Sequence, residues 1–115
     1  MLRGEIRLVD LDPARGPEAN KRRPAIVVSN DAVNSTAARL GRGVVTVVPI
    51  TSNVERVYPF QVLLPAGTGG LPRDSKAQAE QVRSIATERV GQRIGALPST
   101  ELAAVDVALR LHLAL

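Results

Sequence analysis

The sequence has no cysteine and no tryptophan, and it has one histidine, one tyrosine and one phenylalanine among 115 residues. Without cysteine, neither a disulfide framework nor a thiolate metal site can form. The lone histidine, His112, lies in an apolar C-terminal segment and is interpreted as a residue of a helix face or an interface. A Ser-His-Asp triad and a pair of catalytic histidines are therefore excluded. Two ring aromatics, Tyr58 and Phe60, are too few for a platform that stacks several single-stranded bases.

Long hydrophobic runs are also missing. No stretch of about eighteen or more apolar residues is present, so no membrane span is predicted. The N-terminal stretch MLRGEIRLVD lacks the apolar region of a signal peptide. We therefore expect a cytoplasmic protein with one domain, residues 1–115, whose core consists mainly of Val, Leu, Ile and Ala.

Positive charge is in excess. The 15 Lys and Arg residues outnumber the 11 Asp and Glu residues, which gives a net charge of +4 and a pI of about 10.6. Arginine supplies nearly all of the positive charge, and its planar guanidinium suits bidentate contact with phosphate. A nucleic-acid partner fits this composition, as does a merely solubilising surface. Charge alone does not separate binding from catalysis.

Several segments have the alternating or β-branched pattern of strands. In the first, Ile6 and Leu8 are expected on one face and Glu5, Arg7 and Val9 on the other. Residues 75–86 are ambiguous by propensity, but alternation favours a pair of strands over a helix. The predicted extended segments are 4–11, 24–30, 43–50, 58–64, 75–86 and 88–98, with a polar loop at 51–57 and a turn-rich connection at 65–74.

Two helices are predicted. The first spans residues 31–41, begins after Asn30 or Asp31 as the N-cap and ends at Gly41. The second spans residues 99–115, with Ser99 as the expected N-cap and Glu101 near the positive end of the helix dipole. Its apolar stripe suits packing against a sheet. We expect Leu111 and Leu115 to be exposed beside the stripe, where they suit a contact with a partner. The stripe consists of Leu102, Val105, Leu109 and Leu113.

These elements predict a small α+β or mainly-β domain. The strands are expected to form a strongly bent antiparallel sheet resembling a barrel, with one short helix and a C-terminal helix packed against it.

The loop RGPEANKRRP, residues 15–24, concentrates cations and one carboxylate between two predicted strands. RNA carries its own nucleophile, the 2′-hydroxyl, so metal-free cleavage needs a base, donors for the phosphorane charge and help for the leaving oxygen. This loop offers a carboxylate base and guanidinium donors, and Thr51 and Ser52 offer hydroxyls. Asp10 and Asp12 are interpreted as strand-end and turn residues rather than metal ligands. No metal and no cofactor are predicted.

Four short motifs follow one another in a fixed order. They are G-x-E at 16–18, R-P at 23–24 opening the second strand, TS at 51–52 ending the third, and EQVRSI at 80–85. Each motif is weak alone, but the ordered set resembles the MazF/PemK family, also called Kid, of toxin endoribonucleases. The resemblance extends over residues 3 to 113.

The resemblance implies a fold, an activity and partners. The fold is a homodimer of SH3-like barrels of the CcdB/PemK type, with single-stranded RNA, expected to be messenger RNA, across a groove formed by both subunits. The activity is sequence-specific, metal-independent cleavage that leaves a 2′,3′-cyclic phosphate and a 5′-hydroxyl. The protein partner is a MazE-like antitoxin of a type II toxin-antitoxin system, whose C-terminal arm fills the RNA groove.

By position, the resemblance also implies site residues. Arg23 and Thr51 match the catalytic pair, and Glu18 matches a carboxylate near the site that is either a base or a positioning residue. A guanidinium rarely gives up its proton, so Arg23 is expected to stabilise the phosphorane through two hydrogen bonds. Tyr58 is expected in the core unless it stacks on a base. The expected RNA-binding residues are Lys21, Arg22, Ser52, Asn53, Tyr58, Gln81 and Arg83, and the loops 13–22 and 52–58 are expected to choose the RNA sequence.

Two other functions stay open at the level of sequence. A CcdB-like toxin directed at gyrase shares the barrel fold, but its gyrase contact uses a C-terminal tryptophan that this chain lacks. A non-catalytic RNA-binding module is the second alternative, and the presence of both Arg23 and Thr51 argues against it.

Overall fold

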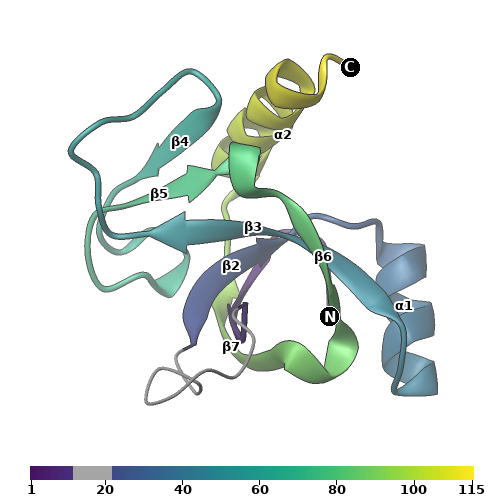
Figure 1. The fold of residues 1–115 in the computed structure, drawn as a ribbon. Helices are drawn as coiled ribbons and strands as arrows, with labels where there is room; N and C mark the ends of the chain where they lie inside the picture. Colours follow the sequence, from purple (N-terminus) through teal and green to yellow (C-terminus); the bar gives the residue numbers. More distant parts are fainter. Residues whose placement is uncertain (12–21) are drawn as a thin grey trace.

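The structure is a computed structural model that describes residues 1–11 and 22–115. These residues form seven strands and two α-helices. The helices are α1 (Asp31–Leu40) and α2 (Ser99–Leu113), and three short 3-10 segments link strands: η2 (Thr68–Gly70), η3 (Ala79–Gln81) and η4 (Thr87–Arg89). The strands are β1 (Glu5–Val9), β2 (Arg23–Val27), β3 (Val44–Thr51), β4 (Gln61–Leu64), β5 (Ser75–Gln78), β6 (Arg83–Ala86) and β7 (Val90–Ala96). The predicted α+β class, with its short helix and C-terminal helix, is confirmed (Figure 1).

All strand pairs are antiparallel, and β3 is the hub of the sheet. The order is β4-β5-β3-β2-β1-β7, with β6 paired to β3 beside this path. The first half of β3 pairs with β6, its last two residues pair with β5, and β2 lies along its other edge. Figure 1 shows β3 crossing the middle of the molecule, with α1 at one end and β4 and β5 at the other.

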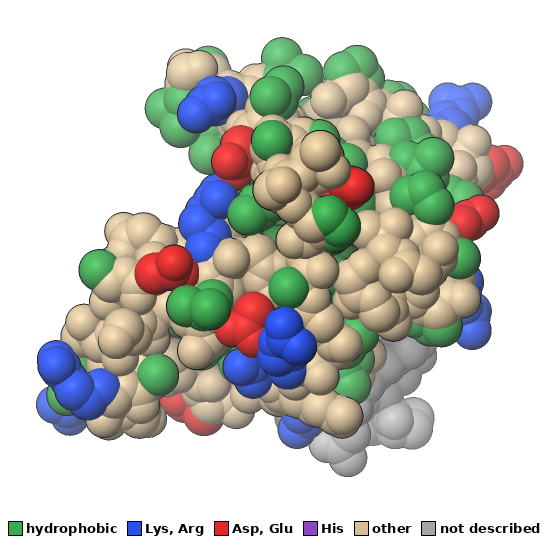
Figure 2. Space-filling view, turned by 180° about the vertical axis from the view of Figure 1, so that it is seen from behind, with side chains coloured by type: hydrophobic (Ala, Val, Ile, Leu, Met, Phe, Trp, Pro, Cys, Tyr) green, Lys and Arg blue, Asp and Glu red, His purple; other side chains and the backbone are tan. Residues whose placement is uncertain are grey.

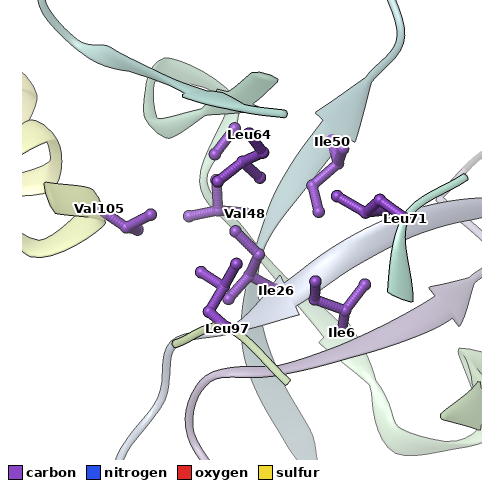
Figure 3. Packing of buried hydrophobic residues seen from close by; sticks show 9 residues of the cluster. Ile6, Ile26, Val48, Ile50, Leu64, Leu71, Leu97 and Val105 are labelled. Carbon is purple, nitrogen blue, oxygen red and sulfur yellow. The ribbon is translucent and has the colours of Figure 1, made fainter. Parts of the chain in front are cut away.

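β3 is buried on both faces because its side chains alternate between two hydrophobic clusters. Val48 and Ile50 belong to one cluster, which α2 covers through Val105. Val45 and Val47 belong to the other cluster, which also contains residues of β1, β2, α1 and β6. Figure 3 shows Val105 directed at Val48 in the first cluster. Each of these buried aliphatic side chains stabilises the fold by roughly 1.5–3 kcal/mol, so β3 is the best anchored strand.

Helix α1 begins and ends where its sequence predicts. The Asn30 side chain accepts a hydrogen bond from the Val33 amide at 2.8 Å, which confirms Asn30 as the N-cap. Gly41 follows the helix with φ of 64°, a left-handed conformation that glycine adopts without strain. Asn34 is fully buried in this helix, where its amide donates to the Ser29 carbonyl at 2.9 Å; the sequence pattern did not predict this burial.

The alternation predicted for β1 places Ile6 and Val9 on opposite faces, and the two residues pack in different hydrophobic clusters. Both are fully buried because each face of β1 contributes to one of the two clusters. The pairing of β1 with β7 shifts register between Ile6 and Arg7 and again between Arg7 and Val9. Glu5 is also buried, beside Arg7 and Arg93.

Residues 75–86 form two strands, as predicted, but these strands do not pair with each other. The 3-10 turn η3 separates β5 from β6, and each strand pairs with a different part of β3. β4 begins at Gln61, so Tyr58 lies before the strand rather than in it.

Helix α2 departs from prediction at both ends. Ser99 is the first helical residue rather than the N-cap, because Pro98 occupies the N-cap position. Val105 is buried and Leu102 and Leu109 pack against the core, but Leu113 is exposed at the helix end. The predicted exposure of Leu111 and Leu115 is confirmed, and His112 is exposed on the helix surface.

In the described residues, no helix combines the length and apolar character needed to span a membrane. On the face of the molecule seen in Figure 2, acidic and basic side chains lie close to one another, and hydrophobic side chains gather toward the top, the level of α2 in Figure 1. Among the described residues, that face shows no extended cationic surface of the kind that attracts nucleic acid.

Candidate active site

Arg23 and Thr51 lie at the same edge of the sheet, because β2 and β3 pair in antiparallel register. Ala25 is opposite Pro49 in this pair. Continuing the register by two residues places Arg23, the first residue of β2, opposite Thr51, the last residue of β3. Directly opposed residues share one face of a sheet. The guanidinium and the hydroxyl therefore start from neighbouring backbone positions on one face.

Both residues line a hollow of about 430 Å³ at this edge. Two arginines, Arg23 and Arg73, contribute guanidinium groups, and three residues contribute hydroxyls. Apolar residues, among them the buried Ile50 and Leu71, form the rest of its wall. The complete lining is Arg23, Pro24, Ile50, Thr51, Ser52, Leu71, Pro72, Arg73 and Ser75.

The connection between β4 and β5 places Arg73 at this hollow. The Gly67 amide donates to the Leu71 carbonyl at 2.7 Å, and the Ala66 amide donates to the Asp74 carboxylate at 2.8 Å. Leu71, fully buried, anchors the connection in the core. Sequence reasoning missed Arg73 and Ser75, since their place depends on the path of this connection. The only local signal is the polar run RDS directly after the Leu-Pro pair at 71–72, of which Leu71 is buried.

The loop 52–60 follows Thr51 at the hollow, and hydrogen bonds hold it near both of its ends. The Asn53 amide donates to Thr51 Oγ1 at 3.2 Å, and the Tyr58 amide donates to Gln61 Oε1 at 3.1 Å. Tyr58 and Phe60 stack on each other, with ring centroids 5.4 Å apart and planes within 5°. Tyr58 is 44% exposed, so its expected place in the core is wrong, and its ring is accessible at the surface.

The structure does not bring all of the predicted site residues to this hollow. Among the predicted residues that the structure describes, Arg23, Thr51 and Ser52 line it. Arg22 lies against Gly91 of β7, and the positions of Asn53, Tyr58, Gln81 and Arg83 are exposed but outside the lining. Glu18 and Lys21, together with Asp12, lie outside the described residues.

The lining of the hollow suits an anion. No carboxylate belongs to it among the residues that the structure describes, whereas two guanidinium groups and three hydroxyls do. The Ser75 hydroxyl already donates to the Arg73 carbonyl at 2.9 Å, so Thr51 and Ser52 are the hydroxyls that can donate to an anion. Arginine forks bind two oxygens of one phosphate, and hydroxyls donate to a third. Within the described ranges, no three His, Asp or Glu residues are grouped closely enough to hold a metal ion. A second hollow of about 450 Å³ beside α1 is lined mainly by apolar side chains and suits a phosphate less well.

One carboxyl group outside this hollow has a shifted pKa. Burial raises the pKa of Glu5, but the Leu2 amide hydrogen bond, the positive charges of Arg7 and the N-terminus, and the Arg93 hydrogen bond outweigh that effect. The net result is a pKa below the usual value of 4.5. Glu5 therefore remains ionised while it holds β1 to β7.

Comparison with known proteins gives concordant matches. The family model described as PemK-like, MazF-like toxin of type II toxin-antitoxin system matches residues 2–113. The chain is 68% identical over 113 residues to Endoribonuclease MazF9 of Mycobacterium tuberculosis, an alignment that covers 98% of this chain and 96% of that relative.

Solved structures agree over the full length of the chain. The crystal structure of MazF from Deinococcus radiodurans matches with a TM-score of 0.78 at 29% identity, covering 100% of this chain and 97% of that one. A MazE-MazF crystal structure from the same organism matches with a TM-score of 0.75 at 26% identity, covering 100% and 96%.

Proposed function

Because the chain belongs to the PemK-like, MazF-like family of toxins of type II toxin-antitoxin systems, we propose that it is an endoribonuclease that cuts single-stranded RNA at a short sequence. The observation that carries this proposal is the shared hollow of Arg23 and Thr51, with Arg73, Ser52 and Ser75 beside them. Guanidinium and hydroxyl donors around one cavity are what a phosphodiester in a charged transition state requires.

The reaction uses the nucleophile that RNA carries. The 2′-hydroxyl loses its proton as it attacks the adjacent phosphorus, and the bond to the 5′-oxygen of the next nucleotide breaks. That oxygen takes up a proton from water, which leaves a 2′,3′-cyclic phosphate and a 5′-hydroxyl. The Arg23 guanidinium binds two oxygens of the phosphorane, and the Thr51 hydroxyl donates to a phosphate oxygen. Arg73 adds a second positive charge. Glu18 remains our candidate for the group that accepts or orients the 2′-hydroxyl proton.

The proposal includes a place and partners in the cell. The protein acts in the cytoplasm as a homodimer, and a MazE-like antitoxin inhibits it. Support for the antitoxin comes from the similarity to the MazE-MazF structure of Deinococcus radiodurans. Messenger RNA is the expected substrate.

Digestion of a long RNA by the purified protein in EDTA tests the activity. We expect cuts at a short recurring sequence, with 5′-hydroxyl and 2′,3′-cyclic phosphate ends mapped by sequencing. The Arg23→Ala variant should lose about 10³-fold in cleavage rate because the phosphorane loses its bidentate donor. Arg39→Ala, which removes one exposed arginine from α1, should cleave like the wild type.

Three outcomes would contradict the proposal. An active, folded Arg23→Ala protein would remove its mechanism. RNA that is bound but left intact would favour the non-catalytic module, and stalled gyrase complexes without RNA cleavage would favour a gyrase-directed toxin.

A further inference from the structure

Lys76 lies next to the candidate catalytic hydroxyl but does not line the hollow. It is the Cα partner of Thr51 in the pairing of β5 with β3, so the two side chains share one face of the sheet. The Lys76 residue is only 8% exposed. Its ammonium donates a hydrogen bond to the Arg56 carbonyl at 2.5 Å. Lys76 therefore contacts the backbone of the loop 52–60.

Stability does not explain why a lysine occupies this largely buried position. Among residues 1–11 and 22–115, no carboxylate forms an ion pair with Lys76 within 4.0 Å. Burying a charge without an opposite charge costs free energy, and an apolar side chain of similar volume at such a place is often neutral or stabilising. The contribution that distinguishes lysine here is the hydrogen bond to the loop.

A second hydrogen bond holds the same loop at Tyr58, two residues after Arg56. The Gln61 side chain accepts from the Tyr58 amide and donates to Glu80 Oε2 at 2.7 Å. Gln61 is opposite Gln78, which follows Lys76 by two residues, so Gln61 and Lys76 point to the same face of the β4-β5 hairpin. The hairpin therefore fixes the loop at Arg56 and at Tyr58.

The fixed part of the loop presents groups that can reach bases. Ser52, Asn53 and Tyr58 lie along it, and its first turn is hydrogen-bonded to Thr51 itself. Single-stranded RNA is recognised through the edges of splayed bases and through stacking on aromatic rings. A loop that is held in one conformation before RNA arrives chooses among bases more sharply than a loop that must be ordered on binding.

We propose that Lys76 is a positioning residue: its hydrogen bond to the Arg56 carbonyl fixes the loop 52–60 beside Thr51 and thereby sets which RNA sequence is cut. This inference rests on the proposed function, and it adds a determinant of specificity that touches neither the scissile phosphate nor the bases. Removing the ammonium should change the choice of RNA sequence more than the chemistry.

Two measurements on Lys76→Met test the inference, because methionine keeps the length of the side chain and removes the charged donor. Without RNA, backbone amides of residues 53–58 should exchange with solvent about tenfold faster, a factor within the range of one hydrogen bond from a charged donor. Amides of β3 and α2 should exchange as in the wild type. With a long RNA and mapped ends, the preference for the best cleavage sequence over the next best should fall about tenfold.

Arg56→Ala is the matched control. It removes one positive charge from the same loop and leaves the carbonyl that accepts from Lys76. This variant should keep the wild-type exchange at residues 57 and 58. Arg39→Ala, a change on α1 outside the loop, should keep the wild-type order of preferred sequences. Lys76→Arg, which keeps a cationic donor, should restore most of the preference. If Lys76→Met does not fold, Lys76→Gln serves the same test, since its shorter side chain does not reach the carbonyl.

The outcomes separate this inference from the proposed function. A Lys76→Met protein with a lower unfolding midpoint but unchanged loop exchange and unchanged sequence preference would overturn the inference. If the wild type does not cut RNA, the proposed function and the specificity role both fail. The exchange measurement then decides whether Lys76 holds the loop.

Discussion

The Thr51 hydroxyl has two roles, one in the local structure and one in the proposed reaction. It ends β3 at the hollow, and its oxygen accepts a hydrogen bond from the Asn53 amide. With that lone pair used by the loop, the hydroxyl hydrogen is left to donate to a phosphate oxygen. The local structure thus orients the group that the proposed reaction needs.

Replacing this hydroxyl by a methyl group measures its role. We expect Thr51→Val to lower kcat about 10²-fold, the usual effect of removing one donor to a charged transition state. Thr51→Ser should retain most of the activity. Thr46→Val makes the same chemical change earlier on β3, where the hydroxyl contacts Ser84 Oγ at 3.2 Å, and it should leave kcat unchanged. A Thr51→Val enzyme with wild-type kcat would show that the hydroxyl takes no part.

At the scale of elements, the position of Arg73 depends on how closely η2 packs on β7. A Cβ added to Gly95 would lie 2.2 Å from the Gly69 carbonyl oxygen. Gly69 itself has φ of 56°, in the left-handed region. The chain then continues from η2 through Leu71 to Arg73, so this contact between backbones sets one wall of the hollow.

Gly95→Ala should therefore disturb both stability and the hollow. We expect a loss of about 1–3 kcal/mol in the free energy of unfolding, because a backbone segment must move to admit the methyl group. Urea denaturation measures this loss. Gly91→Ala in the same strand is the control: its nearest obstacle at 2.3 Å is the mobile end of the Arg22 side chain, so the loss should be smaller. Equal losses in the two variants would contradict the steric explanation.

Elements were predictable from sequence where their signals are local. Asn30 and Gly41 mark the ends of α1 within the chain itself, and both predictions are confirmed. The burial of Val9 was not predictable, since it depends on a second hydrophobic cluster on the other face of the sheet, which residues of α1, β3 and β6 form from distant parts of the sequence. The same distinction applies to the site: Arg23 and Thr51 stand at strand ends that the sequence marks, whereas Arg73 reaches the hollow by a turn-rich path.

At the scale of the whole molecule, Glu5 links β1 to β7, the first and the last strand along the chain in the described residues. Its carboxylate contacts Arg7, Arg93 and the N-terminal amino group, and accepts from the Leu2 amide. These partners lower its pKa in the folded protein below 4.5. A carboxyl group with a lowered folded pKa adds stability above its unfolded pKa, and that stability is lost as the pH falls through the folded value.

Acid unfolding tests this link. The wild type should lose stability as the pH falls from about 4.5 toward the lower folded pKa of Glu5. At pH 7, Glu5→Gln should be less stable by about 1–3 kcal/mol, because the buried Glu5 position loses its charge and its cationic partners Arg7 and Arg93 lose their counter-charge. Its urea midpoint should also change less than that of the wild type as the pH falls below 4.5. Glu88→Gln, at an exposed position, should follow the wild type; a parallel acid response of Glu5→Gln would contradict the assignment.

The central strand has a consequence for control of the proposed enzyme. β3 is held by three neighbouring strands and by side chains on both faces, so it opens only when the whole domain opens. Local unfolding of β3 therefore does not inactivate the Thr51 hydroxyl at its end. An inhibitor must block access instead, and when it dissociates the enzyme is already folded, with no delay for refolding.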